Sequence, residues 1–124
     1  MKQGEIWLIN LDPTVGAEMS KTRPAVIVND DQLGKLPLKI VAPITDWKEH
    51  YSIASWMIAI NPSKQNGLTK KSSIDCFQIR SVSKNRLIKR IGHITLTEIL
   101  QVKGGIAKVI GYDKSSNFTF SDDY

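Results

Sequence analysis

Short apolar runs separated by polar turns occupy most of the chain and predict strands. The runs are rich in β-branched and aromatic residues, and several end at proline, asparagine or aspartate, which favour turns. Six strands are predicted, at residues 5–11, 25–28, 39–44, 52–60, 74–82 and 89–91. Residues 84–86, between the last two strands, leave room for a helical turn.

A helical pattern follows the last predicted strand. Thr95 and Glu98 have the spacing of a capping box, and apolar residues recur at helical spacing to about Tyr112. Gly104 and Gly105 interrupt this pattern. Because each glycine costs a helix ~1 kcal/mol relative to alanine, we expect them to mark a close contact or a kink. The whole pattern predicts a mainly β fold, a small curled antiparallel barrel with a C-terminal helix.

Two of the predicted strands contain an irregularity. Pro43 indicates that the third strand ends there or lies at a sheet edge, because proline cannot donate to the ladder. In the fifth strand, alternation places Gln78 and Arg80 on one face and Asp75 on the other. The two faces could exchange at Phe77.

The composition fits one globular domain. With 124 residues, 41% of them apolar, the chain can bury one core without disulfides or a metal. Its single cysteine, Cys76, excludes an internal disulfide framework and a four-cysteine zinc site, and we expect it to fill the core. We predict one domain at residues 1–112 and a polar, flexible tail at 113–124.

The chain lacks the usual signals for membranes and secretion. No apolar run approaches the ~18 residues of a membrane span, and the chain starts without an apolar signal segment. We therefore expect a cytoplasmic protein with no membrane partner.

Positive charge is concentrated in one stretch. The net charge is +5, and residues 64–90 contain eight basic residues and one acidic residue. Such a surface suits an anionic partner, and with Trp56 and Phe77 nearby in sequence it fits single-stranded nucleic acid. A solvated face without a partner is the alternative.

The long polar segment at residues 12–23 contains the first candidate for chemistry. Loops of this length are usually functional or mobile. Arg23 stands where the loop re-enters the sheet, and Pro24 biases it toward an extended backbone, so its guanidinium could be presented to a phosphate. The alternatives are a solvated hairpin loop and a surface ion pair between Arg23 and Glu18. Thr45, at the exit of the third strand, could donate to a phosphate or cap a turn.

Histidine and metal chemistry are not favoured. His50 and His93 lie far apart in the sequence without a readable acidic partner, which argues against a paired-histidine nuclease. No cluster of histidine and cysteine has metal-ligand spacing. We expect no metal ligands and no cofactor.

Three blocks of sequence together resemble one family. Residues 4–28 begin GEIWLINLDPT and end TRPAVIV, residues 40–46 are IVAPITD, and residues 78–95 are QIRSVSKNRLIKRIGHIT. In this order they resemble the MazF/PemK/Kid family of bacterial toxins. The resemblance covers about residues 3–110.

The resemblance implies a fold, an activity and partners. The implied fold is a strongly curved β-barrel of the Src-homology-3-like kind with a C-terminal helix. The implied protein is the toxin of a type II toxin–antitoxin system and a metal-independent endoribonuclease. It cuts single-stranded messenger RNA, with ribosomal RNA as a further substrate, at short motifs by attack of the 2′-hydroxyl. Its implied partners are a second copy of itself, an acidic and partly disordered antitoxin, and operator DNA reached through that antitoxin.

The family's site residues can be carried over by position. Its catalytic arginine falls on Arg23, its catalytic threonine on Thr45 and its acidic loop residue on Glu18, which is the candidate general base. The implied RNA-binding residues are Lys21, Thr22, Asp75, Gln78, Arg80, Lys84 and Arg86.

Three positions depart from the family's pattern. Ala17 stands where some members have histidine, Met19 where glutamine is usual, and Phe77 where many have an acidic residue. We expect Asp75 to replace the charge missing at Phe77, and we expect the departures to affect base preference.

Two other functions remain as alternatives. One is a toxin of the same fold that inhibits DNA gyrase, but that relative acts through a tryptophan in its C-terminal tail, and this chain ends NFTFSDDY. The other is a non-catalytic RNA-binding barrel, against which the presence of Arg23 and Thr45 argues.

Overall fold

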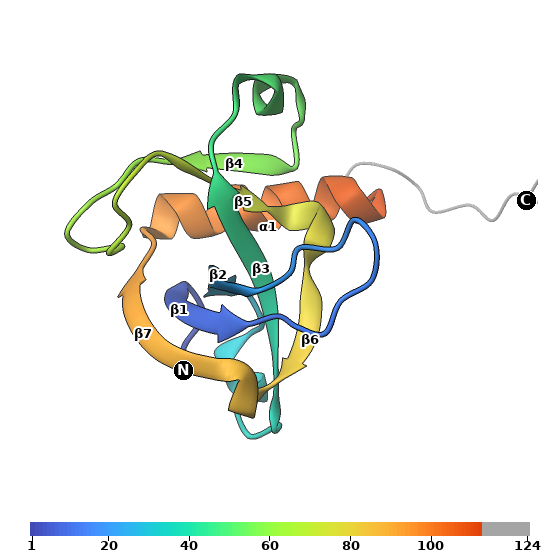
Figure 1. Ribbon diagram of the computed structural model, residues 1–124, viewed down its shortest axis with the longest axis vertical. Coiled ribbons are helices and arrows are strands. Elements are labelled where there is room, and N and C mark those ends of the chain that lie inside the picture. Colours follow the sequence, from blue (N-terminus) through green and yellow to red (C-terminus); the bar gives the residue numbers. More distant parts are fainter. Residues whose placement is uncertain (113–124) are drawn as a thin grey trace, which may run out of the picture.

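Seven antiparallel strands form one curled sheet, and a helix lies behind it (Figure 1). The computed structural model describes residues 1–112, so the predicted tail at 113–124 lies outside the described residues. The elements are β1 (Glu5–Asn10), β2 (Thr22–Ile27), β3 (Leu38–Asp46), β4 (Met57–Ile60), β5 (Ser72–Asp75), β6 (Arg80–Ser83), β7 (Leu87–His93) and α1 (Leu96–Ile110). The strand order is β4-β5-β3-β2-β1-β7, and β6 pairs with β3.

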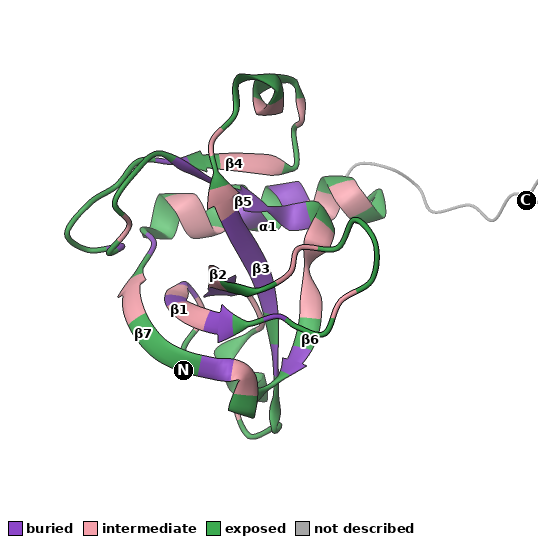
Figure 2. Cartoon of the chain, viewed as in Figure 1, coloured by how far each residue is buried: buried purple, intermediate pink, exposed green. Residues whose placement is uncertain are grey.

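The long strand β3 changes its partner part way along one edge. Its first half, residues 38–41, pairs with β6, and its last residues, 44–46, pair with β5, while β2 lies along its other edge. Pro43 falls where the partner changes, so its missing N–H breaks no ladder bond there. The expectation that Pro43 marks a strand end or a sheet edge is therefore wrong: it lies inside β3, which is buried along most of its length (Figure 2).

Both faces of the central strands are buried, as in a barrel. Alternate residues of β1, β2 and β3 belong to two apolar clusters because successive side chains point to opposite faces. The first cluster contains Ile6, Val26, Ala42 and Ile44 with Val102 of α1, and the second contains Ile9, Ala25, Ile27 and Val41 with Val82 and Leu87. The predicted mainly β fold with a C-terminal helix is confirmed.

Two predicted strands are only partly correct. Of residues 52–60, only Met57–Ile60 is a strand, and Glu49–Ile53 forms a short 3-10 helix. The predicted strand 74–82 is interrupted, because β5 ends at Asp75 and a 3-10 turn follows before β6. The Asp75 carboxylate accepts a hydrogen bond from the Phe77 N–H at 2.9 Å, which stabilises this turn. The expected helical turn at Lys84–Arg86 is present.

The helix begins as its sequence predicts and ends at Ile110, two residues before the predicted end. The Thr95 hydroxyl accepts from the Glu98 N–H at 3.1 Å, and the Glu98 carboxylate accepts from the Thr95 N–H at 2.8 Å, which completes the capping box. Gly111, with φ of 73°, terminates α1 in the left-handed conformation.

Gly105 marks a close contact between α1 and the sheet. A Cβ at this position would lie 2.8 Å from Sγ of Cys76, whereas a Cβ at Gly104 would meet nothing within 4 Å. Cys76 is fully buried, as expected, and burial raises the pKa of its thiol to about 12. A close contact, one of the two roles expected for these glycines, is therefore confirmed for Gly105.

The two glycines should respond oppositely to alanine. We expect Gly104→Ala to stabilise the protein by about 0.5–1 kcal/mol, because alanine favours the helix and the site is open. Gly105→Ala should destabilise it by about 1–3 kcal/mol, because the new methyl group overlaps Cys76 in a packed core. Urea denaturation of both variants measures the difference. Equal effects of the two substitutions would contradict the close-contact role of Gly105.

Candidate active site

The ends of β2 and β3 bring the two predicted catalytic residues together. The β2–β3 register ends with Ala25 opposite Pro43, and Arg23 and Thr45 lie two residues beyond that pair on the two strands. Side chains two positions apart point to the same face, and directly opposite residues have Cβ atoms ~5 Å apart. Continuation of the register would set Arg23 opposite Thr45, and Pro24, the residue after Arg23, does line one small hollow together with Thr45. We infer that Arg23 and Thr45 are neighbours on the face that carries Pro43.

The guanidinium of Arg23 is only partly engaged. Its Nε donates to the Ser20 carbonyl at 2.9 Å, and within residues 1–112 Arg23 forms no ion pair. The alternative of a surface pair with Glu18 is wrong, because the Glu18 carboxylate instead accepts from the Val15 N–H at 2.7 Å. The two terminal amino groups of Arg23 are therefore available to an anion.

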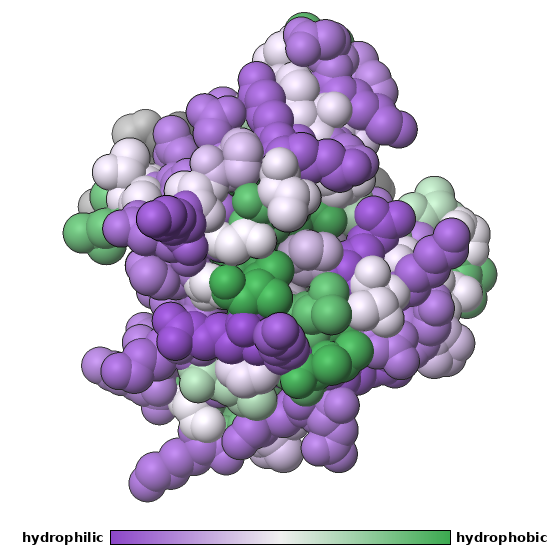
Figure 3. All heavy atoms as spheres, turned by 60° about the vertical axis from the view of Figure 1, so that its left-hand side comes forward, coloured by the Kyte–Doolittle hydropathy of each residue, from purple (hydrophilic) through white to green (hydrophobic). Residues whose placement is uncertain are grey.

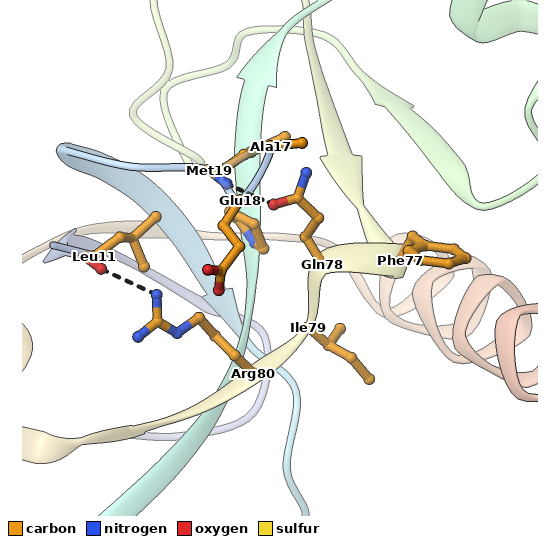
Figure 4. A pocket seen from close by; sticks show the side chains of 9 residues that line it. Leu11, Ala17, Glu18, Met19, Phe77, Gln78, Ile79 and Arg80 are labelled. Atoms are coloured by element: carbon orange, nitrogen blue, oxygen red, sulfur yellow. Dashed lines mark hydrogen bonds between the residues drawn. The ribbon is translucent and has the colours of Figure 1, made fainter. Parts of the chain in front are cut away.

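An open pocket of about 450 Å³ lies on the same side of the sheet (Figure 4). Its walls come from the loop after β1, from β3 and from the segment between β5 and β6. The lining residues are Leu11, Ala17, Glu18, Met19, Pro43, Phe77, Gln78, Ile79 and Arg80. The pocket thus combines an apolar floor with a carboxylate, an amide and a guanidinium. Ala17, Met19 and Phe77, the three positions that depart from the family's pattern, all line this pocket.

The loop between β1 and β2 is fixed to the pocket at several points. The Gln78 Oε1 accepts from the Met19 N–H at 2.6 Å, and an Arg80 Nη1 donates to the Leu11 carbonyl at 3.0 Å. Arg86 donates from Nη1 to the Asp12 carbonyl and to the Asn10 carbonyl. Arg80 and Arg86, expected to bind RNA, therefore each brace the start of the loop with at least one of their donors.

The neck of the same loop is closed by backbone contacts of Lys21. The Leu11 N–H donates to the Lys21 carbonyl at 2.9 Å, and the Lys21 N–H donates to Asp12 Oδ1 at 2.9 Å. Lys21 has φ of 70°, a left-handed conformation that turns the chain toward β2. The side chains of Lys21 and Thr22 are exposed beside Arg23.

Two predicted RNA-binding residues lie outside this cluster. The Lys84 N–H donates to the carbonyl of Pro37, the residue before β3, which at ~3.3 Å per residue is ~26 Å along the strand from Thr45. Asp75 is 6% exposed and does not line the pocket. Burial raises the pKa of Asp75, and its carboxylate caps the 3-10 turn. The expectation that Asp75 replaces the charge missing at Phe77 is therefore wrong, because it serves to hold the turn that carries Gln78.

Thr45 also borders a smaller hollow, and it lies opposite a serine that the sequence analysis did not single out. The hollow, of about 210 Å³, is lined by Thr45 together with Pro24, Ile44 and Lys70 among others. Ser73 of β5 lies directly opposite Thr45. Only the strand register brings Ser73 here, and no motif in the sequence could have indicated it.

The described residues contain neither a cluster of metal ligands nor a membrane-spanning helix. Across residues 1–112, no group of three or more histidine, cysteine, aspartate or glutamate side chains could hold a metal ion. In that part of the chain no helix is long and apolar enough to cross a membrane. His50 packs against Tyr51 with ring centroids 4.6 Å apart, and His93 ends β7 opposite Glu5.

The curled sheet with one C-terminal helix is a MazF-like fold. The crystal structure of MazF from Deinococcus radiodurans matches with a TM-score of 0.75 at 18% identity, covering 90% of this chain and 96% of that chain. A mycobacterial endoribonuclease in complex with its cognate antitoxin matches with a TM-score of 0.71 at 16% identity, covering 90% and 95%.

The chain belongs to the family of PemK-like, MazF-like toxins of type II toxin–antitoxin systems, whose family model matches residues 2–110. The endoribonuclease MazF of Staphylococcus saprophyticus is 33% identical over 112 residues, which are 90% of this chain and 92% of that protein. The endoribonuclease MazF9 of Mycobacterium tuberculosis is 30% identical over 109 residues, 82% of this chain and 89% of that protein. The family resemblance of the three sequence blocks is confirmed.

Proposed function

We propose that this toxin is a sequence-specific, metal-independent endoribonuclease that cuts single-stranded RNA. The observation that supports the proposal is the register of β2 and β3, whose continuation brings Arg23 to Thr45, together with the guanidinium of Arg23, of which only Nε has a hydrogen-bond partner among residues 1–112. Several relatives that match most of the chain are named endoribonucleases, which supports the same activity.

In the proposed reaction the ribose 2′-hydroxyl attacks the adjacent phosphorus. The bond from phosphorus to the 5′-oxygen breaks, giving a cyclic phosphate and a free 5′-hydroxyl. A base must remove the proton of the 2′-hydroxyl, an acid must protonate the departing oxygen, and negative charge must be stabilised on the phosphate in between.

Each of the three proposed catalytic residues has a distinct task. The guanidinium of Arg23 presents positive charge and N–H donors to the phosphate, so it stabilises the charge that develops there and can donate a proton to the leaving oxygen. Thr45 donates its hydroxyl to a phosphate oxygen. Glu18, on the loop that lines the pocket, is the candidate base, and its carboxylate remains exposed.

The proposed RNA-binding surface surrounds this pair. The pocket of about 450 Å³ receives a base next to the cleaved phosphate, with Gln78 and Arg80 on its wall. Lys21 and Thr22 contact the backbone beside Arg23, whereas Lys84 reaches only a more distant phosphate. Because Ala17, Met19 and Phe77 line the pocket, the base preference should differ from that of relatives with histidine, glutamine or an acidic residue there.

The proposed protein partners are a second copy of the chain and an antitoxin. Apolar residues gather in the middle of the face shown in Figure 3, with hydrophilic residues around them, and Phe77 is 63% exposed. Exposed apolar areas of this kind mark protein contacts. The antitoxin would be an acidic segment that folds on binding and covers Arg23 and Thr45, and operator DNA would be reached through it.

RNA cleavage in the presence of EDTA tests the proposal. We expect the purified protein to cut a long unstructured RNA at one recurring short motif, in EDTA, and to leave DNA of the same sequence intact. Sequencing the new RNA ends gives the motif. Activity that disappears in EDTA and returns with magnesium would contradict the proposed mechanism, and inhibition of DNA gyrase without RNA cleavage would favour the gyrase-directed alternative.

A further inference from the structure

Two buried polar groups near Thr45 have no hydrogen-bond partner among residues 1–112. They are the indole Nε1 of Trp47 and the hydroxyl of Ser73. Ser73 is 0% exposed, so water does not reach its side chain from the surface. Buried polar groups in folded proteins are nearly always hydrogen-bonded. Two unpartnered groups next to one proposed catalytic residue therefore indicate a function for them.

The register of β3 and β5 places these groups on the same face as Thr45. Ser73 lies directly opposite Thr45, and the Trp47 N–H donates to the Lys71 carbonyl at 3.1 Å, which continues the ladder by one step. Trp47 follows Thr45 by two positions, so both side chains point to one face. The diagonal from Trp47 to Ser73 is within the ~7–8 Å that an aromatic side chain can span between strands.

The indole of Trp47 is held in place by its neighbours. The Lys71 Nζ lies 4.7 Å from the centre of the ring, close enough for a cation–π interaction. Tyr51 contacts the same ring edge-on, with centroids 5.9 Å apart. The position of Nε1 is therefore set by packing on two sides, whereas the hydroxyls of Ser73 and Thr45 can turn about single bonds.

We propose that Trp47 and Ser73 are positioning residues that orient the hydroxyl of Thr45 toward the phosphate. The indole N–H can only donate, whereas each hydroxyl can donate and accept. A chain of bonds that starts at Trp47 therefore runs in one direction. Nε1–H donates to Ser73 Oγ, the Ser73 hydroxyl donates to Thr45 Oγ1, and the Thr45 hydroxyl is left to donate to the phosphate oxygen.

None of these bonds is present among the described residues, where Trp47 Nε1 and Ser73 Oγ both lack a partner. Forming the chain needs rotation of the Ser73 and Thr45 side chains, and it would give both groups a partner. It also prevents the Thr45 oxygen from facing the negatively charged phosphate with a lone pair. Successive bonds in such a chain strengthen one another. The inference rests on the proposed cleavage of RNA and assigns a role to two residues that the three sequence blocks did not include.

The variants Ser73→Ala and Ser73→Thr test this role. We expect Ser73→Ala to lower kcat for RNA cleavage about 5–10-fold, the effect of one hydrogen bond, with KM changed less than about twofold. Ser73→Thr keeps the hydroxyl and should restore most of kcat. Trp47→Phe keeps the ring without its donor and should also lower kcat with little change in KM.

Ser72→Ala is the matched control. Ser72 is the adjacent buried serine and lines the same hollow as Thr45, but it alternates with Ser73 to the other face of β5, and its hydroxyl already donates to the Lys70 carbonyl at 2.9 Å. Its loss should leave kcat near that of the unchanged protein. A Ser73→Ala protein with unchanged kcat, or a loss equal to that of Ser72→Ala, would overturn the positioning role while leaving the proposed function in place.

A second readout does not depend on turnover. Binding of an oligonucleotide that carries 2′-deoxyribose throughout should shift the Trp47 indole N–H resonance in ¹⁵N-labelled protein, and Ser73→Ala should remove that shift. Trp47→Phe assigns the resonance. A shift that persists in Ser73→Ala would overturn the chain of bonds, and a protein that cuts no RNA under any condition would instead overturn the proposed function.

Discussion

Replacing Arg23 with lysine is expected to lower the rate of RNA cleavage by about 10²–10³-fold, the usual cost of losing a donor to the developing negative charge. The guanidinium presents two parallel N–H groups to a phosphate, whereas lysine offers one compact charge on a flexible stem. Among residues 1–112 neither terminal amino group of Arg23 has a hydrogen-bond or ion-pair partner, so both can make this contact. The Arg23→Lys protein should fold normally and still bind RNA, because the positive charge remains. Single-turnover cleavage with saturating protein measures the loss.

Arg90→Lys provides the control for this substitution. Arg90 lies on β7, 51% exposed, with its Nε 3.6 Å from a Glu5 carboxylate oxygen. Such a surface pair contributes only about 0–1 kcal/mol, so Arg90→Lys should cleave at the normal rate. Near-normal cleavage by a folded Arg23→Lys protein would remove Arg23 from the catalytic role and leave Thr45 and Glu18 to be reassigned.

Replacing Thr45 with valine is expected to lower kcat by about 10–100-fold. Valine preserves the shape of the side chain but removes the hydroxyl, and a hydrogen bond to a charged group contributes about 1.5–3 kcal/mol. Thr45→Ser retains the hydroxyl and should keep most of the activity. The loss should appear in kcat for a short RNA containing the cleavage motif.

Thr97→Val is a suitable control for Thr45→Val, because Thr97 is exposed on the first turn of α1, away from β2 and β3. If Thr45→Val and Thr97→Val cleaved RNA equally well, the hydroxyl of Thr45 would have no part in the reaction.

Local signals in the sequence predicted the parts of the fold that local interactions determine. The capping box at Thr95 and Glu98 and the helical turn at Lys84–Arg86 depend on contacts between near neighbours, and both are present. The break after Asp75 also depends on a local contact, but the apolar and β-branched residues on both sides of it gave a continuous strand pattern. The short 3-10 helix at Glu49–Ile53 was also missed, because its last two residues lead into the apolar run that was predicted as a strand at 52–60.

The candidate site depends on contacts that the sequence does not encode locally. Arg23 was predicted at the start of a strand and Thr45 at the exit of another, but only continuation of the β2–β3 register brings the two residues together. The register of β3 and β5 likewise brings Ser73 to Thr45. The positions of Asp75 and Lys84 in the family's motif predicted RNA contacts less well. The Asp75 carboxylate accepts a hydrogen bond within the 3-10 turn, and Lys84 lies toward the opposite end of β3 from Thr45.

The central claim is that Arg23 and Thr45 promote attack by the 2′-hydroxyl on the adjacent phosphate. A short RNA with a single 2′-deoxyribose immediately before the cleaved phosphate tests it most directly, with the unmodified RNA alongside in EDTA. The account predicts that the unmodified RNA yields a cyclic phosphate and a 5′-hydroxyl and that the modified RNA is not cut at that bond. Cleavage of the modified RNA at the same bond, or products with a 5′-phosphate, would contradict it.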